Sequence, residues 1–438
     1  MGAHSVEAAD FEIDSTMLRD LTVDLVNIPS PPGSEESVAL FLQQYFTDMG
    51  LKTWTQEVEP GRRNVVGVLR GAVGGPTLML LGHLDTVWGG DEEGIRELGP
   101  GFQPRAVADG DWIYGMGAYN MKSGLAAAIA GVRAVIASGR RLRGTLVVAG
   151  VVGETARCQV DRYQGARYRG GGVGAWHLVT NGTMADMAII AEPTHFRVSI
   201  ASGGYVYFRL STRGVPGATY RRGGARLGVA EPVDALNGML ALREAVLKWG
   251  AQYAQAHPYQ GQVATNVSII GLDSGLPFRP TKVPSFARMY VEVGTMPDQR
   301  AQDVIEEFSA MVNEAAETLG IDHVEVDLLQ AIGPAEISPE EFVVGAVARA
   351  HRQVMSQEPE ITFDGWMADT TALTRAGIPA LCYGPAGRMR QGGAGYYAAD
   401  GEQCYLPDLV LGAKVYASAA LDVCSRDRRE VLAGRSTD

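Results

Sequence analysis

Short apolar runs of strand length alternate with helical patterns along the first half of the chain, and this alternation limits the possible folds most strongly. Buried strands are predicted at residues 64–69, 77–81, 145–152 and 187–191, and amphipathic or small-residue helices at 18–28, 37–49 and 121–137. Strands that alternate with helices predict an α/β layer with a largely parallel sheet. At 438 residues, the chain is also too long for one ordinary core.

The pattern changes after Gly204, where strands begin to alternate between apolar and polar residues. Strands are expected at residues 205–212, 265–270, 287–293 and 324–328, and helices at 232–254 and 301–319. This βαββαβ order predicts an α+β domain at residues 205–328. The α/β pattern resumes from about Gly345, so residues 1–204 and 329–438 are expected to form the two parts of one other domain.

Composition narrows the class of partner. The net charge is −12, which argues against nucleic acid and anionic membrane because both require a basic surface. The four cysteines form no CxxC pair, so neither a disulfide framework nor a cysteine zinc site is expected. No apolar run is long enough to span a membrane, and residues 1–20 have no apolar signal segment. We expect a cytoplasmic protein with a small-molecule substrate.

Polar side chains follow several of the predicted strands at their carboxyl ends, where open α/β sheets bind ligands. His83, Glu154 and Glu192 each end or follow a strand, and Asn120 lies in a loop before a helix. Imidazole, carboxylate and amide donors that converge suit Zn²⁺, Mn²⁺ or a similar divalent cation. Asp85 is placed to orient His83 from behind. Spacing alone leaves open a buried structural histidine beside ordinary strand-end acids.

Five motifs occur in a characteristic order. They are residues 82–87 (GHLDTV), 115–124 (GMGAYNMKSG), 151–154 (VVGE), 191–194 (AEPT) and 368–373 (ADTTAL). In this order they resemble the M20 family of metallopeptidases and deacylases, and the resemblance extends over nearly the whole chain. It implies a phosphorylase/hydrolase-like catalytic domain with a mostly parallel mixed sheet. A ferredoxin-like α+β lid domain at 205–328 interrupts that domain, and such lids usually form a homodimer.

The resemblance also implies roles for single residues. His83 matches a metal ligand, Asp85 its catalytic orienting partner, and Glu192 a terminal metal ligand. Asn120 stands where the family has an aspartate that bridges two metals. Glu154 matches the catalytic base, the first of two glutamates. If the family's pair of glutamates aligns with Gly153-Glu154 instead of Glu154-Thr155, Glu154 matches the metal ligand and no residue matches the catalytic base.

Several departures from the family pattern alter what the site can hold. Asn120 offers one neutral oxygen in place of a bridging carboxylate. Thr155 stands where the family has the second glutamate, a metal ligand. Ala398 stands where it has a histidine ligand, although Glu402, the glutamate four residues after that histidine, is kept. Fewer carboxylates support fewer cations, so one divalent metal per subunit, Mn²⁺ or Zn²⁺, is expected. In the lid, Thr219 replaces an oxyanion-binding histidine.

These departures favour a single-metal hydrolase that attacks a C–N bond, which need not be that of an acyl amide. An electron-poor aromatic amine is a suitable substrate, because its ring accepts charge while hydroxide displaces ammonia. The overall pattern of kept and replaced residues resembles the M20 branch of 5-nitroanthranilate aminohydrolases. The alternatives are a dinuclear peptidase or N-acyl amino acid deacylase, and a catalytically inactive homologue. Substrate-binding candidates are Thr219, Arg288, Trp366 and Tyr397, although packing alone explains the aromatic residues equally well.

Overall fold

The expected alternation of strands and helices is present in the computed structural model, which describes residues 11–90, 92–95, 97–155, 169–221, 232–275, 278–392 and 401–433. The chain is divided into two compact units. The first consists of Met1–Ala201, Glu336–Phe363 and Ala368–Asp438, and the second of Ser202–Ala335 and Asp364–Met367. The second unit thus extends beyond residues 205–328 at both ends, partly because its last strand continues past residue 328.

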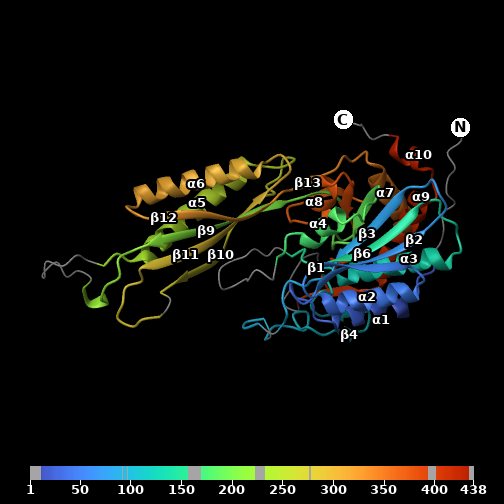
Figure 1. Cartoon of the computed structure of the whole chain (residues 1–438), viewed down its shortest axis with the longest axis horizontal. Coiled ribbons are helices and arrows are strands. Elements are labelled where there is room, and N and C mark those ends of the chain that lie inside the picture. Colours follow the sequence, from blue (N-terminus) through green and yellow to red (C-terminus); the bar gives the residue numbers. More distant parts are fainter. Residues whose placement is uncertain are drawn as a thin grey trace. The chain divides into compact units, whose positions relative to one another are not determined.

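A nine-stranded mixed sheet forms the centre of the first unit (Figure 1). Its strands are β1 (Lys52–Glu59), β2 (Arg62–Arg70), β3 (Thr77–His83), β6 (Thr145–Val151), β7 (Met187–Ile190), β8 (Val198–Ser202), β13 (Ala335–Glu336), β14 (Ile361–Asp364) and β15 (Ala380–Cys382). Their order is β1-β2-β6-β3-β7-β15-β8-β13, and β14 pairs with β8. The expected α/β fold with a mixed sheet is confirmed.

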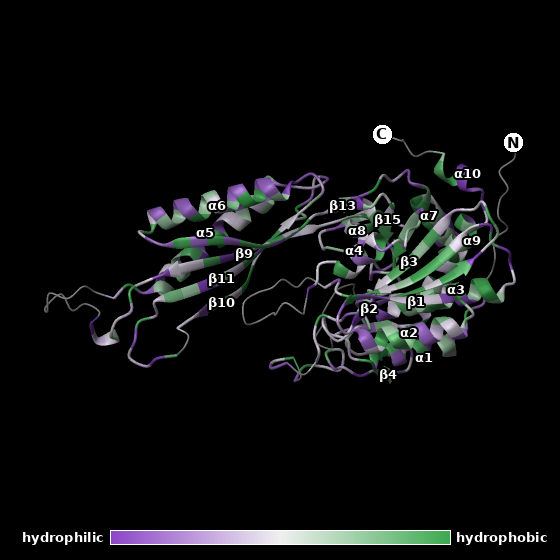
Figure 2. Ribbon diagram, in the orientation of Figure 1, coloured by the Kyte–Doolittle hydropathy of each residue, from purple (hydrophilic) through white to green (hydrophobic). Residues whose placement is uncertain are grey.

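Four parallel strands, β6, β3, β7 and β15, make up the middle of this sheet, and antiparallel pairs flank them. These strands are apolar almost throughout because both faces of the sheet are covered. Figure 2 shows the apolar stretch of β3 in hydrophobic colours. Since the strands are parallel, their carboxyl ends meet at one edge of the sheet.

Helices cover the sheet of the first unit. They are α1 (Ser15–Val26), α2 (Glu36–Asp48), α3 (Lys122–Ala137), α4 (Val173–Thr180), α7 (Phe342–Met355), α8 (Thr370–Arg375), α9 (Leu406–Cys424) and α10 (Arg428–Leu432). The small residues of α3 allow close packing on α9: a Cβ on Gly131 would lie 2.8 Å from the backbone oxygen of Ala413. A separate sheet, ordered β16-β5-β4, joins β4 (Val107–Asp109), β5 (Trp112–Tyr114) and β16 (Gln403–Tyr405).

The second unit is a four-stranded antiparallel sheet with two helices on one face (Figure 1). Its elements are β9 (Gly204–Arg213), a 3-10 turn η1 (Thr219–Arg221), α5 (Ala235–Ala256), β10 (Val267–Ser274), β11 (Phe286–Thr295), α6 (Ala301–Thr318) and β12 (Val324–Ile332). The strand order β10-β11-β9-β12 is ferredoxin-like, as expected. Phe208 of β9 stacks on Phe308 of α6 with 4.3 Å between ring centroids, inside a separate hydrophobic core.

Two further sequence-based expectations concern cysteines and membranes. Cys382, Cys404 and Cys424 are buried free thiols, and Cys158 lies outside the described residues. Among the described helices, none is both long and apolar enough to cross a bilayer.

Candidate metal centre

Three side chains meet where the parallel strands end. His83 is the last residue of β3, Glu154 follows β6, and Glu192 follows β7. β6 and β7 both pair with β3, so all three side chains lie at one edge of the sheet. One ligand atom from each residue lies within 4.8 Å of the other two. The Nε2 atom of His83 is 3.8 Å from Oε2 of Glu154 and 3.9 Å from Oε1 of Glu192.

Both ring nitrogens of His83 face oxygen atoms. Nδ1 lies 2.8 Å from the backbone oxygen of Asp85, and Nε2 lies 2.9 Å from Oδ1 of Asn120. A neutral imidazole has only one N–H, so it can donate to only one of these oxygens. If Nδ1 donates to Asp85, the lone pair of Nε2 and the amide oxygen both point at the same place. A divalent cation there would satisfy both, so the donor set fits a metal.

The carboxylate of Asp85 holds the loop after β6, and its approach to His83 is longer than a hydrogen bond. It accepts hydrogen bonds from the backbone N–H groups of Glu154 and Thr155 at 3.0 and 2.9 Å, and from the Thr155 hydroxyl at 2.6 Å. The closest approach of this carboxylate to Nδ1 of His83 is 3.7 Å. Asp85 therefore orients the imidazole through its backbone oxygen, whereas its side chain positions Glu154.

Glu154 is 5% exposed and lies among other acids. Burial raises its pKa well above the usual value, and the charges of Glu192, Asp369 and Asp85 raise it further. A carboxylate in such surroundings needs a cation nearby to remain ionised. The electrostatics of the cluster therefore agree with its geometry.

The loop that carries Asn120 is held by Glu402, a residue whose role the sequence did not reveal. A single carboxylate oxygen of Glu402 accepts hydrogen bonds from the backbone N–H groups of Gly117, Tyr119 and Asn120, at 2.9, 3.1 and 3.0 Å. Burial raises the pKa of Glu402 to about 7, and these three N–H groups oppose the rise. Glu402 thus fixes the backbone from which Asn120 reaches His83.

Lys122 anchors the other end of the same loop. Its ammonium group donates to the backbone oxygen of Leu25 at 2.8 Å, within the last turn of α1, and to that of Ile28 at 2.7 Å, just beyond the helix. Burial lowers the pKa of Lys122 to about 7. The loop is therefore tied to α1 on one side and to Glu402 on the other.

Asp369 is a second functional candidate that the sequence did not reveal. It caps α8, is 1% exposed, and neither of its carboxylate oxygens has a hydrogen-bond partner among the described residues. Its Oδ1 atom would lie 3.3 Å from a Cβ placed on Gly172, and Gly172 donates its N–H to the backbone oxygen of Gly153. Nothing in the sequence separates such an acid from a surface helix cap, because burial is what marks it.

An ion pair lies behind the Glu154 loop. Arg62 and Glu35 are 1% and 0% exposed, and the guanidinium donates to both oxygens of Glu35. It also donates to the backbone oxygen of Arg169. A Cβ on Gly153 would lie only 2.7 Å from the guanidinium, so this glycine allows the loop to pass close to the ion pair.

The remaining predicted residues lie elsewhere. Thr219 is exposed in η1, Arg288 of β11 has its guanidinium 4.5 Å from the centroid of the Phe286 ring, and Trp366 is half-buried. All three belong to the second unit. Tyr397 and Ala398 lie outside the described residues.

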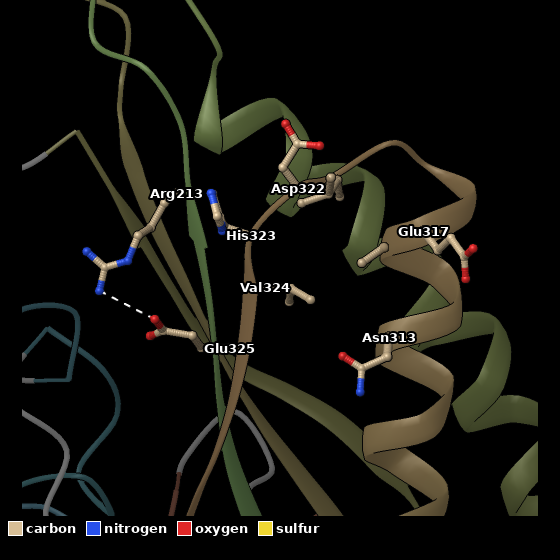
Figure 3. A pocket seen from close by; sticks show the side chains of 9 residues that line it. Arg213, Asn313, Glu317, Asp322, His323, Val324 and Glu325 are labelled. Carbon is tan, nitrogen blue, oxygen red and sulfur yellow. Dashed lines mark ion pairs between the residues drawn. The ribbon is translucent and has the colours of Figure 1, made fainter.

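The second unit also contains a polar pocket of about 420 Å³ between β12, the end of α6 and Arg213 of β9 (Figure 3). Its lining includes an exposed ion pair between Arg213 and Glu325, at 3.5 Å. None of the predicted site residues lines it. Among the residues that the structure describes, the group of His, Cys, Asp or Glu side chains placed to hold a metal ion is the cluster around His83.

Comparison with known families decides the class. The model of Peptidase family M20/M25/M40 matches residues 79–422, which include His83, Asn120, Glu154 and Glu192. The chain belongs to this family. It is therefore a metal-dependent hydrolase of C–N bonds, as its motifs predicted.

The proteins to which this chain is similar differ in the activities that their names describe. The N-formyl-4-amino-5-aminomethyl-2-methylpyrimidine deformylase of Bacillus subtilis is 23% identical over 379 residues, 82% of this chain and 84% of the relative. A tripeptidase from Staphylococcus aureus has a similar fold, with a TM-score of 0.71, 18% identity, and coverage of 94% of this chain and 100% of the other. A dinuclear metal binding M20 peptidase from Bacillus subtilis gives a TM-score of 0.61 at 14% identity, covering 94% and 98%.

Proposed function

We propose that this M20 protein cleaves a C–N bond of a small molecule with one divalent cation, Mn²⁺ or Zn²⁺. His83, Glu154 and Glu192 would hold the cation, and Asn120 would add its amide oxygen. The observation that carries this proposal is the convergence of three buried ligand atoms within 4.8 Å at the carboxyl edge of a parallel sheet. When bound, such a cation supplies an activated water and polarises the oxygen of a carbonyl group.

The donor set supports one cation over two. A second cation beside the first needs a charged bridge, because two like charges must be neutralised at short distance. Asn120 occupies that position with a neutral amide, and Ala398 offers no donor atom. The contrasting possibility is a pair of metals, as in the dinuclear Bacillus subtilis peptidase. Metal analysis of protein purified without chelator decides the matter: one metal per chain is expected, and two tightly bound metals would refute this reading.

In this proposal Asp85 and Glu154 have different roles from those suggested by the family pattern. Glu154 serves as a ligand, because its carboxylate lies with the imidazole of His83 and the carboxylate of Glu192 at the cluster. Asp85 sets the position of Glu154 by accepting its backbone N–H, and it orients His83 through the backbone oxygen. The proton acceptor of the reaction must then be a different residue.

The substrate class that we favour is a small amide, such as a formamide or another N-acyl compound. The Bacillus subtilis deformylase supports this choice, because it is similar over most of both chains and acts on an N-formyl compound. Thr219 stands in place of the family histidine that stabilises an oxyanion. A cation on the carbonyl oxygen would supply that stabilisation instead.

A second candidate is the hydrolytic release of ammonia from an electron-poor aromatic amine such as 5-nitroanthranilate. The observation in its favour is the charge around Glu154, where every described group that shifts its pKa is acidic. A substrate whose own ring accepts the developing charge needs no cationic side chain for that purpose. The relatives give no preference for this reaction over amide cleavage.

A panel of four substrates separates these candidates. Protein loaded with Mn²⁺ or Zn²⁺ would be incubated with an N-formyl aminomethylpyrimidine, an N-acetyl amino acid, a dipeptide and 5-nitroanthranilate, and released amine or ammonia would be measured. Turnover of the formyl or acetyl compound supports our first choice. Turnover of 5-nitroanthranilate alone supports the aromatic reaction, and failure to bind metal or turn over any substrate indicates an inactive homologue.

We also propose that Arg288 and Trp366 bind the substrate, the first through an anionic group and the second by stacking. Thr219 and Tyr397 are proposed to contribute polar contacts. The test is the KM of Arg288→Ala and Trp366→Ala on whichever panel substrate is turned over. A KM unchanged within a factor of two would remove either residue from the site.

We further propose that the second unit pairs with a second copy through β10. This strand is at an edge of the four-stranded sheet and exposes Ile270 and Leu272, which suits strand-to-strand association. Light scattering should give a dimer for the natural protein and a monomer for Ile270→Lys/Leu272→Lys. Leu328→Lys on the opposite edge strand β12 is the matched control. A natural protein that is monomeric at micromolar concentration would refute the pairing.

A further inference from the structure

Hydrolysis requires a group that accepts a proton from water as the new C–O bond forms. The residues at the metal centre are already engaged. Nδ1 of His83 contacts the backbone oxygen of Asp85, and its Nε2 faces the cluster. Glu154 and Glu192 contribute carboxylate oxygens to the same cluster. Asp85 accepts three hydrogen bonds from the loop after β6. A further carboxylate is needed nearby.

Asp369 has the properties of such a group. Its side chain is 1% exposed, yet neither carboxylate oxygen accepts a hydrogen bond from any described residue. A buried carboxylate without a partner is costly, and it persists where a ligand or a reaction uses it. Asp408, Asp186 and Glu402 are buried acids of the same unit, and each has polar partners.

The backbone brings Asp369 to the side of the metal centre. Its Oδ1 atom packs against Gly172, whose N–H donates to the backbone oxygen of Gly153, the neighbour of Glu154. A Cβ on Gly172 would lie 3.3 Å from Oδ1, so the glycine leaves room for the carboxylate. The charge of Asp369 also acts directly on Glu154. Within the part of the chain that the structure describes, Asp369 is thus a buried acid without a hydrogen-bond partner, close enough to Glu154 for its charge to act there.

We propose that Asp369 is the catalytic residue that accepts the proton of the attacking water, and this inference rests on the proposed hydrolase function. The water oxygen bonds to the substrate carbon while one of its protons moves to an oxygen of Asp369. The C–N bond then breaks, its electron pair stays on nitrogen, and nitrogen takes that proton from Asp369. The carboxylate is restored, and the net reaction consumes one water for each C–N bond.

The first test is kinetic and uses Asp369→Asn in the full-length, metal-loaded protein. Loss of a general base lowers kcat by about 10²- to 10⁴-fold, whereas metal content and KM stay close to those of the natural protein. Asp186→Asn is the matched control, because Asp186 is a buried acid at the amino end of β7, away from the ligand edge. In Asp369→Ala, added formate should restore part of kcat by filling the vacated position.

The second test needs no substrate and uses acetohydroxamate, which binds metals as an anion after losing a proton. In the natural protein, Asp369 would accept the proton that acetohydroxamate loses. In Asp369→Asn it would pass to the buffer, a difference of about one proton per site. Titration calorimetry in two buffers of different ionisation enthalpy measures this difference. Thermal unfolding and metal content of both variants show that they are folded.

The outcomes separate the two proposals. Equal proton release by the natural protein and Asp369→Asn overturns the role of Asp369, as does a kcat within fivefold of the natural value. A loss of kcat that parallels loss of metal would also overturn it, because the residue would then be structural. A natural protein that turns over no panel substrate but still shows the one-proton difference refutes only the substrate proposal.

Discussion

His83 is held on both sides of its ring, and the two contacts have different consequences. The Asp85 backbone oxygen on Nδ1 fixes the tautomer, so Nε2 is left to face Asn120 and the two glutamates. Because the backbone makes this contact, substitution of the Asp85 side chain would leave it in place. The side chain of Asp85 acts on the loop of Glu154 instead.

Replacement of Asn120 by aspartate should strengthen metal binding. A charged oxygen replaces a neutral one at 2.9 Å from Nε2 of His83, and charged donors bind cations more tightly; we expect a decrease in Kd on the order of tenfold. Titration calorimetry with Mn²⁺ and Zn²⁺ measures the affinity. Asn181→Asp, at the exposed end of α4, controls for added charge. An unchanged Kd would mean that Asn120 is not a ligand.

Thr155→Val tests whether the Asp85 side chain controls the position of Glu154. The change removes one buried hydrogen bond of 2.6 Å while keeping the size of the side chain, which costs about 1 kcal/mol of stability. Metal affinity should also fall by about tenfold, because Glu154 loses part of its support. Thr22→Val removes a buried hydroxyl bond in α1 and should lower stability alone. Equal metal affinity in both variants would contradict this role.

At the scale of elements, the loop after β6 depends on a glycine, Gly153, at a position with little space around it. Gly153 has a φ of +65°, and a Cβ there would lie 2.7 Å from Arg62 and 2.8 Å from the backbone oxygen of Arg169. The loop needs a glycine for its conformation and also for the space that the buried ion pair occupies.

Gly153→Ala should therefore destabilise the protein by about 2–4 kcal/mol and displace Glu154 from the metal centre. Gly50→Ala, with a φ of +79° and open space around its Cβ, should cost only the conformational part, about 1 kcal/mol. Thermal unfolding and metal titration measure the two effects. Similar losses in both variants would show that contact with Arg62 has no influence.

Elements with a clear apolar period could be predicted from the sequence, whereas those defined by pairing could not. The strands β3, β6 and β7 carry continuous apolar runs, and the predicted ranges match them closely. β1 has no such run because it is a half-exposed edge strand, and it escaped prediction. The strands β4 and β5 have only three residues each and pair across a short turn, and β16 forms where residues 403–405 return to pair with 112–114.

The same distinction applies to the site. His83, Glu154 and Glu192 end apolar strands, so their convergence could be expected from the sequence. Asp369 and Glu402 function through burial and through contacts more distant in the chain, which no local pattern encodes. The acid that we propose as the proton acceptor could therefore be found only in three dimensions.

At the scale of the whole molecule, His351 should make stability depend on pH. It is 2% exposed, its Nδ1 lies 2.9 Å from the hydroxyl of Tyr383, and its Nε2 has no partner among the described residues. Burial lowers its pKa below 6.5, so the unfolded chain binds more protons here than the folded one. Its contribution to stability is therefore present above pH 6.5 and is lost as pH falls toward the lowered pKa.

His351→Gln should flatten the fall of stability between pH 7 and pH 5. Urea unfolding at several pH values measures the free energy of unfolding. His323 is an exposed histidine of the second unit, so His323→Gln is the control for the substitution. A fall of the same steepness in the natural protein and His351→Gln would contradict the assignment.

The three backbone N–H groups on Glu402 have a consequence for synthesis of the chain. Gly117, Tyr119 and Asn120 leave the ribosome long before residue 402, which lies 282 to 285 positions further along. Until then the loop of Asn120 lacks its acceptor, even though β3, β6 and β7 can already pair. A nascent chain would thus carry His83, Glu154 and Glu192 without a finished cation site. The central strands would therefore pair before the site could bind metal. Activity would appear only near the end of translation.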